Sequence, residues 1–281
     1  MVPALTTTDG RTLTYLELGS GPVLVCHPGG PGMPAAIFGD LGGLDRERTL
    51  IELNPRGVAD SDPAQTYTLE DHAADLDELR KHLGLEAIDL FGHSAGGFMS
   101  IVYAAAHPAR VRRLVLCGTF PRFSAESRAA LGRFLAERES DPRFADAVAA
   151  RRERDENPPE DEAELGRLAL RGLPLLFGRF GENEQAFLAR AAESGAGFNV
   201  RSLQYFNERI AATMDLRPLL PQIEARTLVI TGDLDPWGAG AVPELESGIR
   251  DTRVVVMPGI GHMPWVEEAD GFRDELLDFL R

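Results

Sequence analysis

The sequence predicts an α/β fold in which a mostly parallel, twisted sheet is flanked by helices and interrupted by one all-helical insertion. Two observations predict it. Short apolar runs alternate with helical patterns toward both ends of the chain, and the strand signals vanish between about residues 121 and 216. Such alternation is typical of a parallel sheet covered on both faces. We therefore expect a discontinuous core formed by residues 1–120 and 217–281, with residues 121–216 inserted as a helical cap.

The expected strands are short runs of aliphatic residues bounded by polar or glycine-rich segments. They lie at residues 12–18, 23–26, 49–53, 87–91, 114–117, 227–231 and 253–257. A helix is clear over residues 69–83, where leucines and an alanine recur on one face and acidic residues occupy the others. Gly84 follows it and is a typical helix stop. These strands and this helix are the elements expected to form the core.

The predicted cap is rich in Ala, Leu, Arg and Glu and is broken at several prolines. Within it, residues 153–164 are strongly charged and interrupted by Pro158 and Pro159. Charged, proline-interrupted runs are usually solvated. We expect this run to be a mobile connection and not a binding site.

Composition narrows the function classes. Apolar residues make up 43% and charged residues 26% of the 281, values typical of a globular enzyme. The formal charge of −15 repels nucleic-acid phosphates and anionic membrane surfaces, so a small molecule or short peptide is the expected partner. The first ten residues carry neither a basic leader nor an apolar segment, and no apolar run approaches the roughly 20 residues that span a bilayer. We expect a cytoplasmic protein.

Cysteine and lysine are scarce. Cys26 and Cys117 each end an apolar run, which predicts small buried thiols with no disulfide framework. Lys81 is the one lysine and lies in the polar part of a predicted helix. Schiff-base and Ser-Lys mechanisms are therefore disfavoured.

Ser94 is the candidate nucleophile. It is the centre of the sequence GHSAG, directly after the strand at 87–91 and before an Ala-rich helix at 98–106. A strained strand-to-helix turn with flanking glycines lifts a serine hydroxyl out of a sheet. The residue pattern and its context together predict a nucleophile elbow.

A serine hydroxyl needs a base, and the base needs an acid that fixes its tautomer. His262 follows the last predicted strand, and Asp233 and Asp235 follow the strand before it. We assign Asp235 as the acid and regard Asp233 as a turn residue and the alternative. This chemistry requires no metal and no organic cofactor.

The oxyanion formed in acyl transfer needs two backbone N–H donors. Ala95, which follows the nucleophile, is the first candidate. The second should come from the loop HPGGPG at residues 27–32, whose glycines allow close approach of the backbone to a substrate. A phosphate-binding role for this loop is disfavoured, because it fits neither a P-loop nor the GxGxxG pattern.

These motifs together resemble the α/β-hydrolase superfamily over the whole chain. The sequence PGGPG at 28–32, NPRGVADS at 54–61 and the inserted cap are similar to the proline iminopeptidase branch. Two features depart from that branch: Pro28 stands in place of its motif histidine, and the elbow reads GHSAGG where the peptidases have GGSWG. The register of the branch's motif implies Gly30 as the favoured second oxyanion donor, with Gly29 as second choice. The resemblance implies a serine hydrolase that cleaves an ester, thioester, lactone or amide through an acyl-enzyme on Ser94. In that branch cap glutamates hold the substrate's amine. Glu208 is the candidate for that role here, and a solvated helix acid is the preferred alternative.

A substrate pocket with an apolar wall is expected where the predicted strands end. Its candidate residues are Phe120, Trp237, Met263 and Trp265. Trp265 has an alternative role as an anchor for the C-terminal helix. Two other functions stay open: an acyltransferase or lyase that uses the same triad, and a ligand receptor on a hydrolase fold. The sequence does not predict an oligomeric state.

Overall fold

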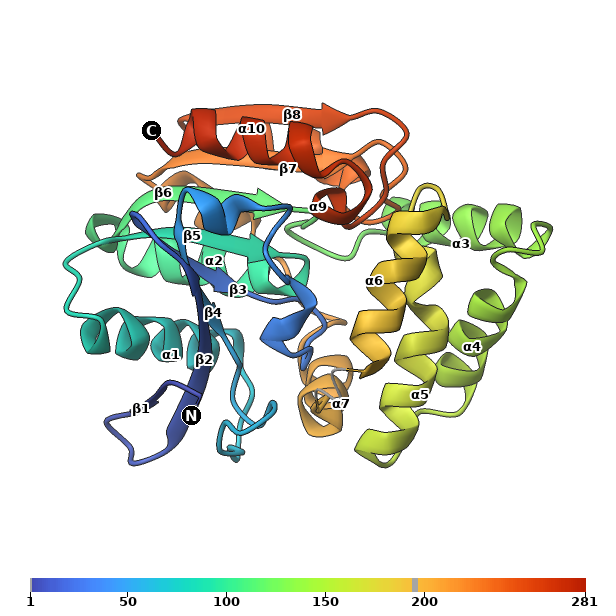
Figure 1. Ribbon diagram of the computed structural model, residues 1–281, viewed down its shortest axis with the longest axis horizontal. Helices are drawn as coiled ribbons and strands as arrows, with labels where there is room; N and C mark the ends of the chain where they lie inside the picture. The colour runs from blue at the N-terminus through green and yellow to red at the C-terminus, as the bar shows by residue number, and fades with distance from the viewer. Residues whose placement is uncertain (1, 194–196) are drawn as a thin grey trace.

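The computed structural model describes residues 2–193 and 197–281 (Figure 1), and over these residues the chain forms an eight-stranded sheet. The strand order is β1-β2-β4-β3-β5-β6-β7-β8. The strands are β1 Ala4–Thr6, β2 Thr12–Gly19, β3 Val23–His27, β4 Thr49–Leu53, β5 Ile88–His93, β6 Val111–Cys117, β7 Arg226–Gly232 and β8 Thr252–Met257. β1 and β2 pair antiparallel, and the strands from β4 to β8 are parallel. The predicted mostly parallel sheet is confirmed.

Helices cover both faces of the sheet. One face carries α1 Leu69–His82, α2 Ala95–Ala106 and α8 Val242–Gly248, and the other carries α9 Pro264–Glu267 and α10 Ala269–Phe279. Short 3-10 helices complete the connections: η1 Ala35–Ile37, η2 Leu44–Arg46, η3 Pro108–Arg110, η4 Leu173–Leu176, η5 Arg217–Gln222 and η6 Ala239–Ala241. None of the helices in the described part of the chain is long and apolar enough to cross a membrane.

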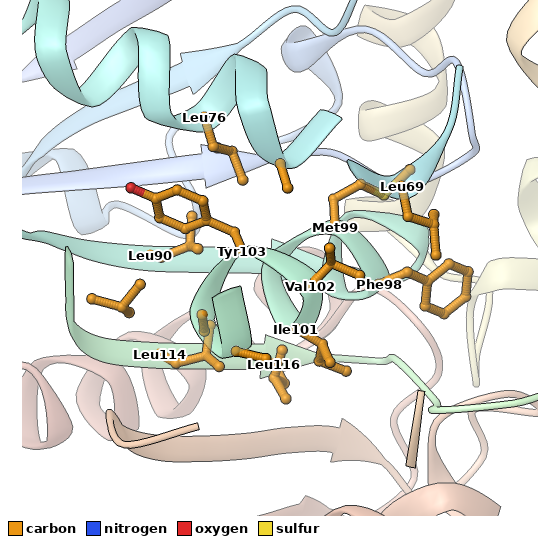
Figure 2. Close-up of a cluster of buried hydrophobic side chains, with 14 of the residues drawn as sticks. Leu69, Leu76, Leu90, Phe98, Met99, Ile101, Val102, Tyr103, Leu114 and Leu116 are labelled. Carbon is orange, nitrogen blue, oxygen red and sulfur yellow. The ribbon is translucent and has the colours of Figure 1, made fainter. Parts of the chain in front are cut away.

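The two faces have separate buried clusters because side chains alternate along each strand. On one face Leu90, Leu114 and Leu116 pack with α2 residues such as Ile101 and Tyr103 (Figure 2). The neighbouring strand residues point the other way and pack with Phe272, Leu276 and Phe279 of α10. The central strands are therefore buried on both sides, and this fixes their register and the places where they end.

The cap lies between β6 and β7. Its helices are α3 Ala125–Glu139, α4 Ala145–Glu156, α5 Glu162–Gly172, α6 Glu182–Glu193 and α7 Val200–Arg209. Figure 1 shows them beside the core, beyond the arrowheads of the parallel strands. The two ends of the cap lie side by side. Arg122 and Asp215 form an isolated antiparallel β-bridge, and the N–H of Leu216 donates to Pro121 O at 2.8 Å. These contacts hold the two ends of the helical segment together at the edge of the sheet.

Glu52 is a carboxyl group that the core buries without a partner. It lies on β4 with no exposed surface, and within the described residues neither of its carboxyl oxygens has a hydrogen-bond partner. Burial, followed by the smaller effects of Asp40 and Asp45, raises the pKa of Glu52 well above its usual range. The native state therefore keeps this proton at pH values where the unfolded chain has lost it.

We expect Glu52→Leu to stabilise the protein by about 1–3 kcal/mol at neutral pH, because an unpaired buried polar group costs that much. The native pKa is raised and an unfolded glutamate ionises near about 4.3. The wild type therefore loses stability as the pH rises above that value, by at most about 1.4 kcal/mol per pH unit for this group. Urea denaturation at several pH values above 5 should show a gain that grows with pH. Glu17→Leu, at an exposed position of neighbouring β2, is the control; a gain from Glu52→Leu that is constant with pH would contradict the expectation.

Candidate active site

Ser94 lies at the turn between β5 and α2 and has a strained backbone, with φ 53° and ψ −121°. The flanking glycines are required by close packing. A Cβ on Gly96 would lie 2.1 Å from His27 O, and one on Gly92 would lie 2.4 Å from Ser100 Oγ. The turn is held from β6, because Ser94 N–H donates to Cys117 O at 2.9 Å and Thr119 Oγ1 donates to Ser94 O at 2.8 Å. The serine side chain lines a cavity between core and cap.

His262 and Asp235 form a buried pair at the ends of β7 and β8. Nδ1 of His262 lies 2.9 Å from Oδ2 of Asp235, and the two residues are 4% and 2% exposed. Asp235 is itself held in place: Thr231 Oγ1 donates to Oδ2 at 3.1 Å and Trp237 N–H donates to Oδ1 at 2.9 Å. A carboxylate placed in this way holds the proton on Nδ1 and leaves Nε2 free to accept one.

Asp233 has a different role in the structure. Its Oδ1 accepts the Gly259 N–H at 2.7 Å, and its backbone N–H donates to Met257 O. Both bonds tie the end of β7 to the turn after β8, which leads to His262. In the structure Asp235 therefore contacts His262, and Asp233 holds the turn.

His93, directly before Ser94, packs against the ring of His262. Its ring centroid lies 4.6 Å from that of His262, and its Nε2 lies 3.0 Å from His262 O. A carbonyl accepts only, so Nε2 carries the hydrogen. Burial, followed by the nearby His262, lowers the pKa of His93 well below its usual range. His93 is therefore a neutral positioning group under the His262 backbone.

The glycine-rich loop after β3 lies against the nucleophile. A Cβ on Gly29 would lie 2.8 Å from Ser94 Cβ, and Gly30 has a φ of +117°, which favours glycine. Gly30 and Ala95 both line the cavity beside Ser94. Neither of their N–H groups donates a backbone hydrogen bond within the described part of the chain. These amides are therefore available to a ligand, while Gly29 contacts the nucleophile and does not itself line the cavity.

The cap is joined directly to the loop that carries His262. His262 N–H donates to Leu176 O at 2.6 Å. The buried Glu267 carboxylate accepts N–H groups from Gly178 and Gly261 at 2.8 Å each and from Arg179 at 3.3 Å. Burial raises the pKa of Glu267 to about 7 despite these bonds. The sequence patterns gave no sign of this connection, because it joins two segments far apart in the chain.

A cavity of about 550 Å³ opens above Ser94 and His262 and extends into the cap. Of the expected pocket residues, Phe120, Trp237 and Met263 line it. Trp265 does not: it is 3% exposed and packs against core residues that include Phe272 of α10. Its anchoring role is therefore the one that the structure supports. Glu208 is exposed on α7 and is also absent from the lining.

Other lining residues had not been predicted. Phe98, Phe123 and Phe206 join Phe120 in an aromatic cluster on the cavity wall. The place of Phe98 in the sequence, four residues after the nucleophile and one helical turn along α2, was an available signal for one of them. Phe206 comes from α7, and only folding brings it to this wall.

The charged run at 153–164 is largely exposed, as expected of a solvated connection: residues 155–158 and 160–164 are exposed, and residues 157–161 join α4 to α5. Glu153, near the end of α4, is paired with Arg167 and Arg171 of α5 at 2.7 and 2.8 Å. Arg154, Asp155, Pro158 and Pro159 also line the cavity. The charge pattern along the chain did not indicate this position beside the cavity, because it does not show which side chains face a neighbouring element.

Metal ligands are not gathered at this site or elsewhere in residues 2–193 and 197–281. No group of three or more His, Cys, Asp or Glu side chains is arranged there to hold a metal ion. Cys26 and Cys117 are both buried as free thiols, and burial raises the pKa of each well above its usual range.

Comparison with known proteins identifies the class. The chain matches the α/β-hydrolase fold family over residues 22–269 and belongs to that family. A serine hydrolase named BPHL from Mus musculus is 25% identical over 97% of this chain and 84% of that protein. A proline iminopeptidase from Lactobacillus helveticus is 34% identical over 37% of each chain. The predicted superfamily, with proline iminopeptidases among the relatives, is confirmed.

Structural comparison agrees with this assignment. The solved structure of an α/β fold family hydrolase from Bacillus anthracis str. Sterne matches with a TM-score of 0.79 and 19% identity over 99% of both chains, a likeness of fold. This chain spans less than half of the length of several curated relatives, including the Lactobacillus peptidase. The chain is thus a hydrolase of the α/β-hydrolase superfamily.

Proposed function

We propose that the chain is a serine hydrolase that cleaves an ester-type bond through an acyl-enzyme on Ser94. One observation carries the proposal: a serine on a strained elbow shares a cavity with a histidine whose other nitrogen is bound to a buried aspartate. This constellation is suited to activating a hydroxyl at neutral pH.

The proposed reaction has two balanced halves. Ser94 Oγ attacks the substrate carbonyl while its proton passes to His262 Nε2, and the N–H groups of Ala95 and Gly30 stabilise the oxyanion. The tetrahedral intermediate collapses, and the leaving group takes the proton from His262. Water then attacks the acyl-enzyme with His262 again as base, which releases the acid and restores Ser94.

The lining of the cavity favours an ester, thioester or lactone over the amide of an aminopeptidase substrate. A peptidase that holds a free amine needs an unpaired carboxylate in its pocket. Among the described residues that line this cavity, Asp155 is the only carboxylate, and Arg151 Nε already binds it at 2.6 Å. Glu208, the sequence candidate for amine binding, lies outside the cavity.

A fluorophosphonate probe tests the proposal. We expect the wild type to be labelled covalently and Ser94→Ala to remain unlabelled. Ser100→Ala is the matched control, because this buried serine lies on α2 and bonds Gly96 O without lining the cavity; it should be labelled like the wild type. Equal labelling of Ser94→Ala, or none of an active wild type, would refute the nucleophile assignment.

A substrate panel then identifies the bond. Hydrolysis of 4-nitrophenyl esters, thioesters or lactones with little turnover of aminoacyl anilides is the expected outcome. Preferential anilide cleavage would restore the aminopeptidase interpretation. Faster product formation with an added alcohol or amine acceptor than with water would indicate an acyltransferase. Labelling without turnover of any substrate would favour a receptor.

A further inference from the structure

The part of the cavity next to the nucleophile is an aromatic wall. Phe98 and Phe120 have ring centroids 4.9 Å apart, and Phe123 lies 4.7 Å from Phe120. Phe206 stacks on Phe98 at 6.0 Å from the cap side. All four line the cavity that contains Ser94. This wall suits an apolar part of a substrate and offers no charge to a polar one.

The cap helix α4 brings charge into the same cavity. Arg151, Arg154 and Asp155 all line it. Arg151 Nε binds Asp155 Oδ2 at 2.6 Å, whereas Arg154 Nε is 3.7 Å from Asp155 Oδ1, beyond hydrogen-bond length. One carboxylate is thus shared by two guanidinium groups. The group carries a net charge of +1, and the cation with the weaker pairing is Arg154.

Two other arginines of the cap, Arg152 and Arg171, are paired closely with carboxylates on its surface. Arg152, two residues before Arg154 on the same helix, binds both Glu139 oxygens at 2.5 and 2.7 Å with its side chain 54% exposed. Arg171 binds Asp146 at 2.7 Å. The Arg154 side chain is only 30% exposed, and burial followed by the nearby Arg151 lowers its pKa. The Arg154 guanidinium is partly buried, and its nearest carboxylate, that of Asp155, lies 3.7 Å away without a hydrogen bond. A ligand carboxylate that bonded this guanidinium would compensate for the solvation it has lost.

We propose that the substrate of this hydrolase carries a carboxylate, which binds Arg154 at the cap end of the cavity. Its scissile carbonyl then lies at Ser94, and its apolar part lies along the aromatic wall formed by Phe98, Phe120, Phe123 and Phe206. The inference rests on the function proposed above. A carboxylate is favoured over a phosphate because the net charge of the Arg151, Arg154 and Asp155 group matches one negative charge, whereas a phosphate monoester carries nearly two.

The test compares 4-nitrophenyl monoesters of straight-chain dicarboxylic acids of six to twelve carbons with the methyl esters of the same compounds. A second series places the carboxylate on the alcohol side. At the best length in one series, we expect the wild type to prefer the carboxylate in kcat/KM by about 10- to 100-fold, the effect of one charged hydrogen bond. The preference should weaken at high salt. Equal rates for charged and neutral substrates at every length and in both series would overturn the proposal.

Variants locate the effect. Arg154→Gln should abolish the preference, measured as the ratio of kcat/KM for the charged substrate to kcat/KM for its neutral methyl ester, a ratio that a general loss of activity does not change. Arg154→Lys should restore part of the preference by keeping the charge. Arg152→Gln is the control on the same helix and should behave as the wild type. Retention of the full preference in Arg154→Gln would refute the assignment.

A binding measurement separates this inference from the proposed mechanism. Calorimetry with the dicarboxylic acid monomethyl esters on Ser94→Ala requires no nucleophile. We expect binding that is weakened about 10-fold or more by adding Arg154→Gln. If the probe fails to label Ser94 but this difference persists, the proposed mechanism is refuted and the anion site is supported. If labelling succeeds and the binding is equal with and without Arg154→Gln, only the anion site is refuted.

Discussion

Asp235→Asn should lower kcat by about 10⁴-fold, the scale seen when the acid of a serine triad is replaced by its amide. Trp237 N–H donates to Oδ1 and fixes the acceptor of the new amide there. The amide NH₂ then faces His262 Nδ1, which must accept, so the ring hydrogen moves to Nε2. A histidine in that tautomer cannot take the proton of Ser94. Steady-state kinetics, with circular dichroism as a check of folding, measures the loss.

Asp233→Asn provides the matched control for this variant. It is the same substitution two residues away, and its Oδ1 can still accept the Gly259 N–H. We expect kcat to stay within a few-fold of the wild type, because a neutral acceptor preserves most of that bond. Similar losses in the two variants would show that the turn as a whole matters and would contradict the assignment of Asp235 as the acid.

Gly29→Ala should lower kcat by about 10²- to 10³-fold, the cost of losing one oxyanion donor. The added Cβ would lie 2.8 Å from Ser94 Cβ and 3.1 Å from His93 O. Because Cys117 and Thr119 hold the backbone of the Ser94 turn by hydrogen bonds, the glycine-rich loop is the part that must shift. The shift carries the Gly30 N–H away from the carbonyl oxygen it is proposed to bind. Burst kinetics with a 4-nitrophenyl ester would show slower acylation with a smaller change in KM.

Gly132→Ala tests whether any added methyl group has this effect. Gly132 is exposed on α3, and its Cβ would meet nothing within 4 Å. We expect unchanged kinetics and a gain in stability of about 0.5–1 kcal/mol from the better helix former. A wild-type acylation rate in Gly29→Ala, with folding verified by a thermal melt, would contradict the proposal that this loop supplies an oxyanion donor.

Much of the core could be predicted because its patterns are local. All seven predicted strands occur, six of them within two residues of their expected ends, while β6 begins at Val111, three residues before its expected start. The helix expected at 69–83 is α1 at Leu69–His82, with a capping box between Thr68 and Asp71. β1 was not predicted: three residues at the edge of the sheet carry too short a pattern, and pairing with β2 makes them a strand. The placement of β2 antiparallel to β4 likewise comes from tertiary pairing.

The sequence by itself determined the class of fold, and it predicted the serine elbow, the order of the three candidate catalytic residues and the position of the cap. Each depends on residues adjacent in the chain or on the ends of strands, which a parallel sheet gathers at one edge. Only the tertiary structure decided which aspartate meets His262, that Trp265 serves the core, and that Glu267 joins the cap to the catalytic loop. It also decided that Arg154 faces the cavity while Arg152 faces solvent. These outcomes depend on how helices rotate and pack against distant segments, and residue order along a chain does not encode that geometry locally.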